Sequence, residues 1–170
     1  MNRRLGIVLI AGSIVAVALS LAACNTARGG GSIAILQGNE SRKATFGFQL
    51  VCEPTDNPYA PKVSGQFEYQ DHAAKDAKGK PMRVSIHGVA TGVSTAAQES
   101  NVGTYTGTYT AQPEVPGYSG EPGIFTVTVV DNDKPGLSGE DTFTLVLVGG
   151  PFDGYSVESK VLAGGNIKTF

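Results

Sequence analysis

The segment Ala44-Thr45-Phe46-Gly47-Phe48-Gln49-Leu50-Val51-Cys52 decides the fold class, because its large apolar side chains recur at every second residue. In an extended strand this spacing places Phe46, Phe48 and Leu50 on one face. No stretch after Cys24 repeats apolar residues at helical spacing over three turns. The same alternation returns in the segments 62–70, 82–89, 103–110, 123–130, 141–148, 154–162 and 166–170. The sequence therefore predicts an all-β domain of about eight or nine strands.

Turn residues separate these strands. The chain has 23 glycines and nine prolines, and pairs such as Pro116-Gly117 favour tight reversals. Alternating strands bury one face each, so two antiparallel sheets must pack together or one sheet must close on itself. We expect a single antiparallel β-sandwich over residues 33–170, with a small β-barrel as the alternative. Consecutive glycines at 29–31 and 164–165 predict that the first and last strands pair and close the sheet edge.

The N-terminus has the pattern of an export signal. Arg3 and Arg4 precede residues 5–23, which contain no charged side chain and favour a signal helix. A helix of that length could also span a bilayer of about 30 Å, so an uncleaved transmembrane segment is the alternative. Either arrangement places the domain outside the cytoplasm.

The residues Leu21-Ala22-Ala23-Cys24 resemble the lipobox of bacterial lipoproteins. The resemblance implies a signal peptide over 1–23, cleavage before Cys24, and a diacylglycerol with acyl chains such as palmitate on the Cys24 thiol. Two or more acyl chains attach a protein stably to a membrane. We therefore expect a lipidated Cys24, a glycine-rich tether over 24–32, and a location on the inner or outer membrane of the bacterial cell envelope.

The charge of the mature chain and the second cysteine bear on two questions: whether the protein binds nucleic acid and whether it has a free thiol. Loss of Arg3 and Arg4 with the signal leaves 11 basic and 15 acidic residues, a net charge of −4. No basic run offers a track for phosphates, which argues against nucleic acid as a partner. With Cys24 assigned to lipid, Cys52 is predicted to be unpaired. It shares the phase of Leu50, so we predict a buried and unreactive thiol.

The best candidate site is acidic. Asp131-Asn132-Asp133 follows one predicted strand and Glu140-Asp141 precedes the next. If this connection folds back, the carboxylates of Asp131, Asp133, Glu140 and Asp141 converge on a structural Ca²⁺, which takes about six to eight oxygen ligands. The spacing does not fit an EF-hand loop. The alternative is a solvated turn without a cofactor, in which Asp131 and Asn132 bond to their own backbone.

Tyr105 and Tyr109 lie on one face of the predicted strand 103–110, with Gly107 between them. Two rings about 13 Å apart over an open floor favour a carbohydrate chain as ligand. Because this is the only apolar face of the strand, burial in the core is the alternative. The opposite face of this strand is a threonine ladder: Thr104, Thr106, Thr108 and Thr110. Ice-binding surfaces repeat such ladders over several adjacent strands. On a single strand, exposed β-branched residues are simply typical of strand composition.

The sequence has no motif that predicts catalysis. His72 and His87 are too far apart in sequence for a metal cluster, and there is no HExxH or CxxC motif. His72 is expected in a polar loop and His87 on an outward face. Turns around Ser119 and Ser138 differ from the nucleophile elbow of hydrolases. We predict a protein that is not an enzyme, with a hydrolase as a remote alternative.

Several short motifs occur in a fixed order over residues 29–170: Gly29-Gly30-Gly31-Ser32-Ile33, Ala44-Thr45-Phe46-Gly47-Phe48, Gly65-Gln66-Phe67-Glu68-Tyr69, residues 125–132, Pro135-Gly136, Asp141-Thr142-Phe143 and Gly164-Gly165-Asn166-Ile167. This order resembles the post-COAP module of secreted bacterial proteins. The resemblance implies a β-rich extracellular module and carries no established reaction or ligand. We therefore predict a lipid-anchored, non-catalytic envelope module with a structural or protein-interaction role. The alternative is a surface module that binds carbohydrate or Ca²⁺.

Overall fold

The computed structural model describes residues 25–170 except 38–39, 58–59, 76–78, 94–100 and 134–139. This part of the chain is all-β, as predicted, with eight strands and one short 3₁₀ helix. No helix in it is long and apolar enough to cross a membrane. The predicted signal peptide and Cys24 lie outside the described residues. The elements are β1 (Ala27–Gln37), β2 (Glu40–Glu53), β3 (Lys62–Lys75), β4 (Pro81–Val93), β5 (Val102–Ala111), β6 (Gly123–Val130), β7 (Thr142–Val148), η1 (Gly150–Phe152) and β8 (Ser156–Thr169).

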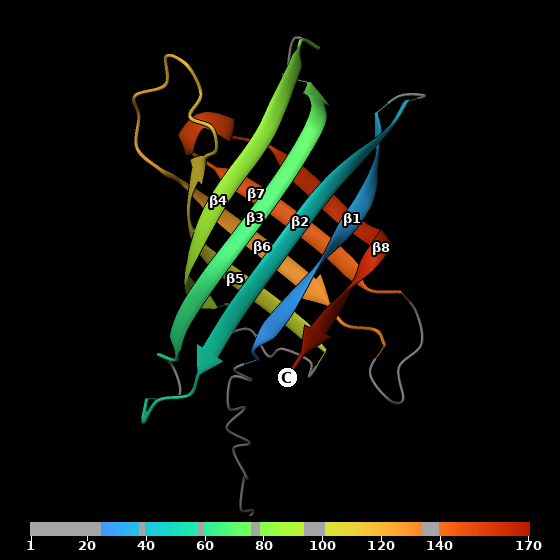
Figure 1. The fold of residues 1–170 in the computed structure, drawn as a ribbon. Coiled ribbons are helices and arrows are strands. Elements are labelled where there is room, and N and C mark those ends of the chain that lie inside the picture. Colours follow the sequence, from blue (N-terminus) through green and yellow to red (C-terminus); the bar gives the residue numbers. More distant parts are fainter. Residues whose placement is uncertain (1–24, 38–39, 58–59, 76–78, 94–100, 134–139) are drawn as a thin grey trace, which may run out of the picture.

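The eight strands form one closed antiparallel barrel in sequence order, in which β8 returns to pair with β1 (Figure 1). The prediction of two packed sheets is therefore wrong, and the small barrel is the correct alternative. Alternation does not separate the two architectures, because each strand has one buried face in both. The pairing of the first and last strands separates them.

Glycines at the seam between β1 and β8 let the two strands approach closely. Gly31 pairs with Gly165, and Gly30 pairs with Asn166. A Cβ on Gly31 would lie 2.3 Å from the Gly164 carbonyl oxygen, and one on Gly165 would lie 2.2 Å from the Gly30 carbonyl oxygen. Gly165 also has a φ of 106°, which residues with side chains rarely adopt. The predicted pairing of the first and last strands is confirmed.

The strands extend further into the glycine-rich segments than predicted. β1 begins at Ala27, so most of the predicted tether over 24–32 is strand. The two predicted strands 154–162 and 166–170 are largely one strand, β8, which continues through Gly164 and Gly165. A glycine has no side chain but keeps its backbone N–H donor and C=O acceptor. Glycine-rich segments, whose composition is typical of linkers, therefore form a hydrogen-bonded seam here.

Inward side chains fill the barrel. Phe143 stacks on Phe46 at 4.2 Å and on Tyr69 at 6.0 Å between ring centroids, and Phe67 lies 5.2 Å from Phe125. Each such pair adds about 0.5–1.5 kcal/mol to the gain from burial. These rings occupy the space in which some eight-stranded barrels hold a small ligand. The largest fully buried side chains are Tyr69, Tyr105, Tyr109, Phe67, Phe125, Phe143, Ile33, Leu50, Ile86, Leu145, Leu147 and Ile167.

Cys52 differs in part from its prediction. Its side chain is buried, as its phase predicts. The residue is disulfide-bonded, so the predicted unpaired thiol is wrong. Cys24, the other cysteine of the chain, lies outside the described residues. Strand phase predicts the burial of Cys52 but not its pairing, which depends on the chemical state of Cys24.

Replacing Gly165 by alanine tests the seam. The methyl group would collide with the backbone of Gly30 and Gly31 at a strained φ, so we expect a loss of about 2–4 kcal/mol in the free energy of unfolding. Gly47→Ala in β2 is the matched control, since nothing lies within 4 Å of its added Cβ. The control should change stability by less than about 1 kcal/mol. Equal losses in urea denaturation would show that the seam has no special role.

Candidate functional site

Because consecutive strands run in opposite directions, the connections between them alternate between the two ends of the barrel. The tether end holds residue 25, Phe170 and the β2–β3, β4–β5 and β6–β7 connections (Figure 1). The far end holds the β5–β6 loop (112–122) and the β7–β8 connection (149–155). Thr26 and Phe170 exchange two backbone hydrogen bonds of 3.3 and 2.9 Å, which join the residue before β1 to the residue after β8. Asn25, the first described residue, therefore lies at the tether end.

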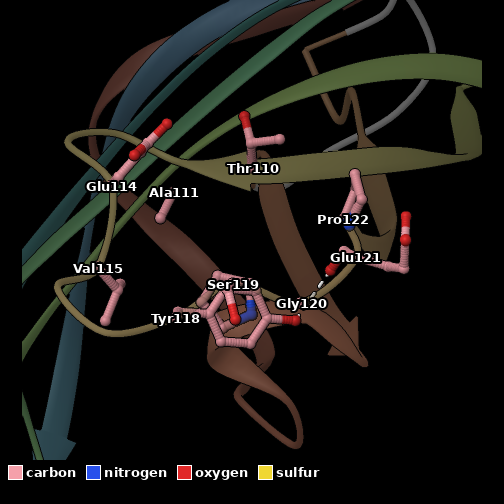
Figure 2. Close-up of a pocket in the computed structure, with 10 residues that line it drawn as sticks. Thr110, Ala111, Glu114, Val115, Tyr118, Ser119, Gly120, Glu121 and Pro122 are labelled. Atoms are coloured by element: carbon pink, nitrogen blue, oxygen red, sulfur yellow. Dashed lines mark hydrogen bonds between the residues drawn. The ribbon is translucent and has the colours of Figure 1, made fainter.

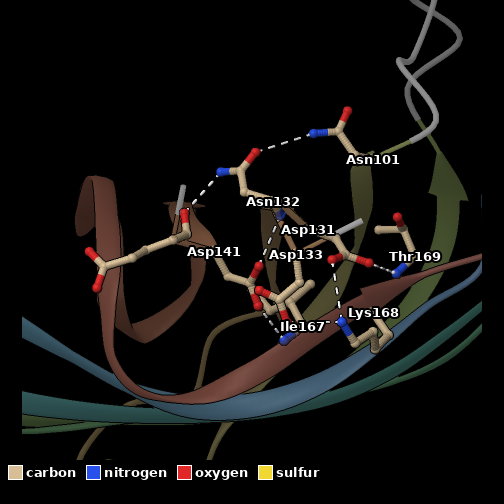
Figure 3. A network of polar contacts seen from close by, with 9 residues as sticks. Asn101, Asp131, Asn132, Asp133, Asp141, Ile167, Lys168 and Thr169 are labelled. Atoms are coloured by element: carbon tan, nitrogen blue, oxygen red, sulfur yellow. Dashed lines mark hydrogen bonds and ion pairs between the residues drawn. The ribbon is translucent and has the colours of Figure 1, made fainter. Parts of the chain in front are cut away.

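Three of the four predicted acidic ligands meet at the tether end. Carboxylate oxygens of Asp131, Asp133 and Asp141 lie within 4.8 Å of one another (Figure 3). Asp131 follows β6 and Asp141 precedes β7, so the connection folds back and brings the two together. Glu140 does not belong to this group. Its side chain is exposed, and its backbone carbonyl accepts a hydrogen bond from Asn132 Nδ2 at 2.9 Å.

The two buried carboxylates of this acidic cluster accept hydrogen bonds from backbone N–H groups. Asp131 accepts one from Thr169 at 2.9 Å. Asp141 accepts one from Ile167 at 2.7 Å and one from Asn132 at 2.9 Å. Hydrogen bonds to an ionised acceptor are about twice as strong as neutral ones. The cluster therefore fastens the β6–β7 connection to the last residues of β8.

Lys168 supplies the positive charge of the cluster. Its ammonium nitrogen lies 2.9 Å from Asp133 Oδ2 and 3.7 Å from Asp131 Oδ1. The hydrogen bond to Asp133 raises the pKa of Lys168 above its ordinary value. Asp131 Oδ1 is buried and has no hydrogen-bond donor among the described residues, so this ion pair compensates its charge. A Ca²⁺ ion would compete with Lys168 for these carboxylates, and the metal site stays a prediction.

Sequence reasoning missed Lys168 because it lies 35 residues from Asp133. The residue becomes a neighbour only through the closed barrel, which places the end of β8 beside the β6–β7 connection (Figure 3). The predicted pairing of the first and last strands was the signal available, but by itself it does not place β8 beside this connection.

The predicted carbohydrate platform on β5 is wrong. The rings of Tyr105 and Tyr109 are 0% and 1% exposed, inside the barrel. The Tyr105 hydroxyl donates to the Asn25 carbonyl, and the Tyr109 hydroxyl donates to the Gly149 carbonyl at 2.6 Å. Burial raises the pKa of both phenols. The alternative prediction, that this apolar face lies in the core, is the correct one.

A buried ion pair lies among the aromatic side chains. Arg42 on β2 contacts Asp71 on β3 at 3.5 Å, and both side chains are largely buried. The Tyr155 hydroxyl donates to Asp71 at 3.0 Å and lies 2.6 Å from the Tyr69 hydroxyl. The pKa of Tyr155 is raised above its ordinary value, mainly because the phenol is buried and also because Tyr69 and Asp71 lie beside it. The sequence predicts a polar loop at this point, but Asp71 continues the inward phase of Tyr69, and the group serves to join strands inside the barrel.

The far end has a hollow of about 280 Å³ beside the β5–β6 loop (Figure 2). Its lining includes the partly exposed ring of Tyr118 together with Glu114, Glu121, Thr110 and Ser119. The Tyr118 hydroxyl donates to the backbone carbonyl of Glu121 at 2.8 Å, which orients the ring. An accessible aromatic ring with polar neighbours is an arrangement that suits a small polar ligand. Sequence reasoning considered Tyr118 only as part of a serine-containing turn.

The other residues considered for chemistry are dispersed. His87 lies on the outer surface of β4, as predicted, and contacts Glu68 on β3. His72 is exposed and belongs to β3, so the loop predicted for it is wrong. Ser119 lies at the far end, and Ser138 lies outside the described residues.

Comparisons with known proteins assign no relative: no family model, no curated protein and no solved structure matches the chain. The geometry of the described residues therefore carries the functional proposals below.

Asp141→Asn tests the structural role of the acidic cluster. Asparagine has one acceptor oxygen where aspartate has two, so the N–H group of either Asn132 or Ile167 loses its acceptor. We expect the free energy of unfolding to fall by about 1–3 kcal/mol in urea denaturation.

Asp133→Asn is the control, because Asp133 is about half exposed and pairs with Lys168 on the surface. It should change stability by less than about 1 kcal/mol. This variant also tests the metal: bound Ca²⁺ would raise the melting temperature of the wild type, and Asp133→Asn would remove that rise. A wild type that does not respond to Ca²⁺ would contradict the metal site. Equal losses from the two variants would contradict the role of Asp141.

Proposed function

We propose that this chain is a lipid-anchored protein of the bacterial cell envelope whose barrel is a non-catalytic binding or structural module. The observation that carries the proposal is the position of the residues that precede β1. Residue 25 leaves the barrel at the tether end, where Thr26 bonds to Phe170. A lipid on Cys24 would hold this end against the membrane and turn the far end outward.

The sequence supports the anchor. The uncharged segment 5–23 favours export, and the lipobox-like Leu21-Ala22-Ala23-Cys24 favours lipidation. The resemblance to post-COAP modules favours a role outside the cell. Because β1 begins at Ala27, only residues 25 and 26 would separate the lipidated cysteine from the barrel. The barrel would therefore stand close to the membrane surface with little freedom to turn away from it.

The core supports a non-catalytic role. Catalysis needs reactive side chains that converge in a cleft open to substrate. The described interior is instead filled by packed rings and aliphatic side chains, and the buried Arg42 and Asp71 neutralise each other. The polar groups at the tether end bind backbone amides of β8. These contacts stabilise the barrel.

Carbohydrate binding is the second candidate function, and the hollow at the far end favours it. Tyr118 is 41% exposed there, whereas Tyr105 and Tyr109 are buried. Glu114 and Glu121 beside the ring are groups that accept hydrogen bonds from sugar hydroxyls. In the proposed orientation this hollow faces away from the membrane.

The anchor predicts a defined N-terminus. In a bacterial host, the mature chain should begin at Cys24 and carry the mass of a diacylglycerol on its thiol, as measured by mass spectrometry of the N-terminal peptide. Cys24→Ser should abolish both the cleavage and the lipid, because the thiol is the acceptor. Cys52→Ser is the matched control and should leave the lipid in place. A sulfur in a thioether cannot also form a disulfide, so the lipidated chain would have a free Cys52 thiol in place of the disulfide-bonded residue described above. A mature chain with Cys24 joined to Cys52 would contradict the anchor.

Tyr118→Ala tests the carbohydrate candidate. A glycan identified on an array with the wild-type protein should bind at least about tenfold more weakly to the variant, a loss of about 1.4 kcal/mol. Tyr118→Phe is the control, since it keeps the ring and removes only the hydroxyl that bonds to Glu121. Isothermal titration calorimetry measures both. Failure of the wild type to bind any glycan, or equal binding by Tyr118→Ala, would contradict this candidate.

A further inference from the structure

The outer surface of β5, β6 and β7 carries no charged side chain. The three strands contain no Asp, Glu, Lys, Arg or His at any position. Their outward positions are the even-numbered ones, and every residue there is β-branched. We call this surface the Thr/Val wall: Val102, Thr104, Thr106, Thr108, Thr110, Ile124, Thr126, Thr128, Val130, Thr142, Thr144, Val146 and Val148.

The strand register orders the wall into rows across three strands. The rows are Val102–Val130–Thr142, Thr104–Thr128–Thr144, Thr106–Thr126–Val146 and Thr108–Ile124–Val148. The threonine ladder predicted on one strand thus continues onto its neighbours.

The last of these rows is the most apolar part of the wall. Ile124 is 52% exposed and its partner Val148 is 57% exposed. Val146, two residues before Val148, is 40% exposed, and Val89 on β4 extends the row beyond Thr108. Neighbouring exposed aliphatic side chains on a sheet mark an interaction surface more often than scattered ones do.

The rest of the barrel wall is different. Each of the strands β1 to β4 and β8 has at least one exposed or half-buried charged side chain. In Figure 1 the strands β2, β3 and β4 form the front of the barrel, and β5, β6 and β7 form its back. The charged positions include Arg28, Lys43, Lys62, Glu68, Arg83, Glu158 and Lys160.

We infer that a second copy of this chain docks on the Thr/Val wall through a two-fold symmetric contact. Two identical faces meet in such a contact, so each must complement itself. A face with net charge repels its own copy. The Thr/Val wall avoids this repulsion. A hydroxyl group both donates and accepts hydrogen bonds, so threonines complement threonines, and Ile124 and Val148 add apolar area.

The size of the wall sets the strength of the contact. Outward residues repeat about every 6.8 Å along a strand and strands lie about 4.8 Å apart, so the four rows cover about 400 Å². A stable interface buries about 800 Å² on each partner. The contact is therefore weak and reversible.

The direction of the wall suits an anchored protein, and this step rests on the proposed lipid. The wall runs along the side of the barrel, between the tether end and the far end (Figure 1). A two-fold axis parallel to that direction puts both tether ends on the same side of the dimer, where one membrane can hold them. Confinement of the chains to one membrane surface raises their local concentration, which increases the dimeric fraction even when the contact is weak.

Ice is a less suitable partner for the same threonines. An ice surface is planar, whereas the strands of a closed barrel tilt and twist. The exposed row with Ile124 and Val148 also favours contact with protein.

Sedimentation velocity of the whole chain, purified in mild detergent, tests the inference without any contribution from a membrane. Over about 1 μM to 1 mM, the range of a weak interface, the weight-average mass of the protein should rise toward twice that of the monomer. Ile124→Lys places a charge in the most apolar row of each facing wall and should keep the protein monomeric over the same range. Thr45→Lys adds the same charge at an exposed position of β2 and should associate like the wild type.

Thermal melts of the three proteins show whether the variants fold, and Thr126→Lys is the second wall variant if Ile124→Lys melts early. A wild type that stays monomeric would overturn the inference, as would dimers of both folded wall variants. A monomeric Thr45→Lys variant would show that added charge in general, and not the Thr/Val wall, prevents association. Growth beyond a dimer would overturn the two-fold contact. None of these results depends on the lipid, so a failed anchor and a failed dimer are told apart by mass spectrometry of the N-terminal peptide.

Discussion

The contact between β1 and β8 is the constraint on which the rest of the structure depends. An open sheet of these eight strands would leave two unpaired edges and would expose the aromatic face to water. Closure removes both edges and encloses the rings of Phe46, Phe67 and Phe143. The contact is possible because Gly31 and Gly165 have no side chains where the two backbones meet. It also determines which residues share an end of the barrel, and therefore where the candidate sites lie.

The local pattern of the sequence predicts most of the strands. Alternation identifies the inward phase of Phe46, Phe48 and Leu50, and the glycine-rich segments predict the closing pair. The choice between a sandwich and a barrel is not local, because both bury one face of every strand. The same alternation puts Tyr105 and Tyr109 on the apolar face, where packing of the rings outweighs the open floor beside Gly107.

The candidate sites show the same limit. Asp131, Asp133 and Asp141 flank a single connection, so proximity in sequence was enough to group them. Lys168 and the backbone amides of β8 join them only through the closed barrel. Cys52 was misjudged for a different reason, since its pairing depends on the chemical state of Cys24 and not on strand phase. The Thr/Val wall also needed the register, because a ladder on β5 alone has no functional meaning.

Each part of the barrel surface is suited to a different contact. At the tether end, the carboxylates of Asp131 and Asp141 accept hydrogen bonds from backbone amides and Asp133 pairs with Lys168, so these contacts stabilise this end of the barrel. The far end carries loops, an exposed ring and hollows. The side formed by β5 to β7 is uncharged and regular. The same eight strands therefore present separate surfaces without any insertion of a further domain.

The seam also determines how the barrel responds to mechanical force. β1 runs from the tether end toward the far end, with β2 paired along one side and β8 along the other. A pull between residue 25 and a partner held at the far end acts along β1. Hydrogen bonds to both neighbours then bear the load together in shear, whereas a strand pulled sideways from a sheet edge would lose them one at a time. A first strand that is paired on both sides makes the barrel resistant to tension at the point where a tether would apply it.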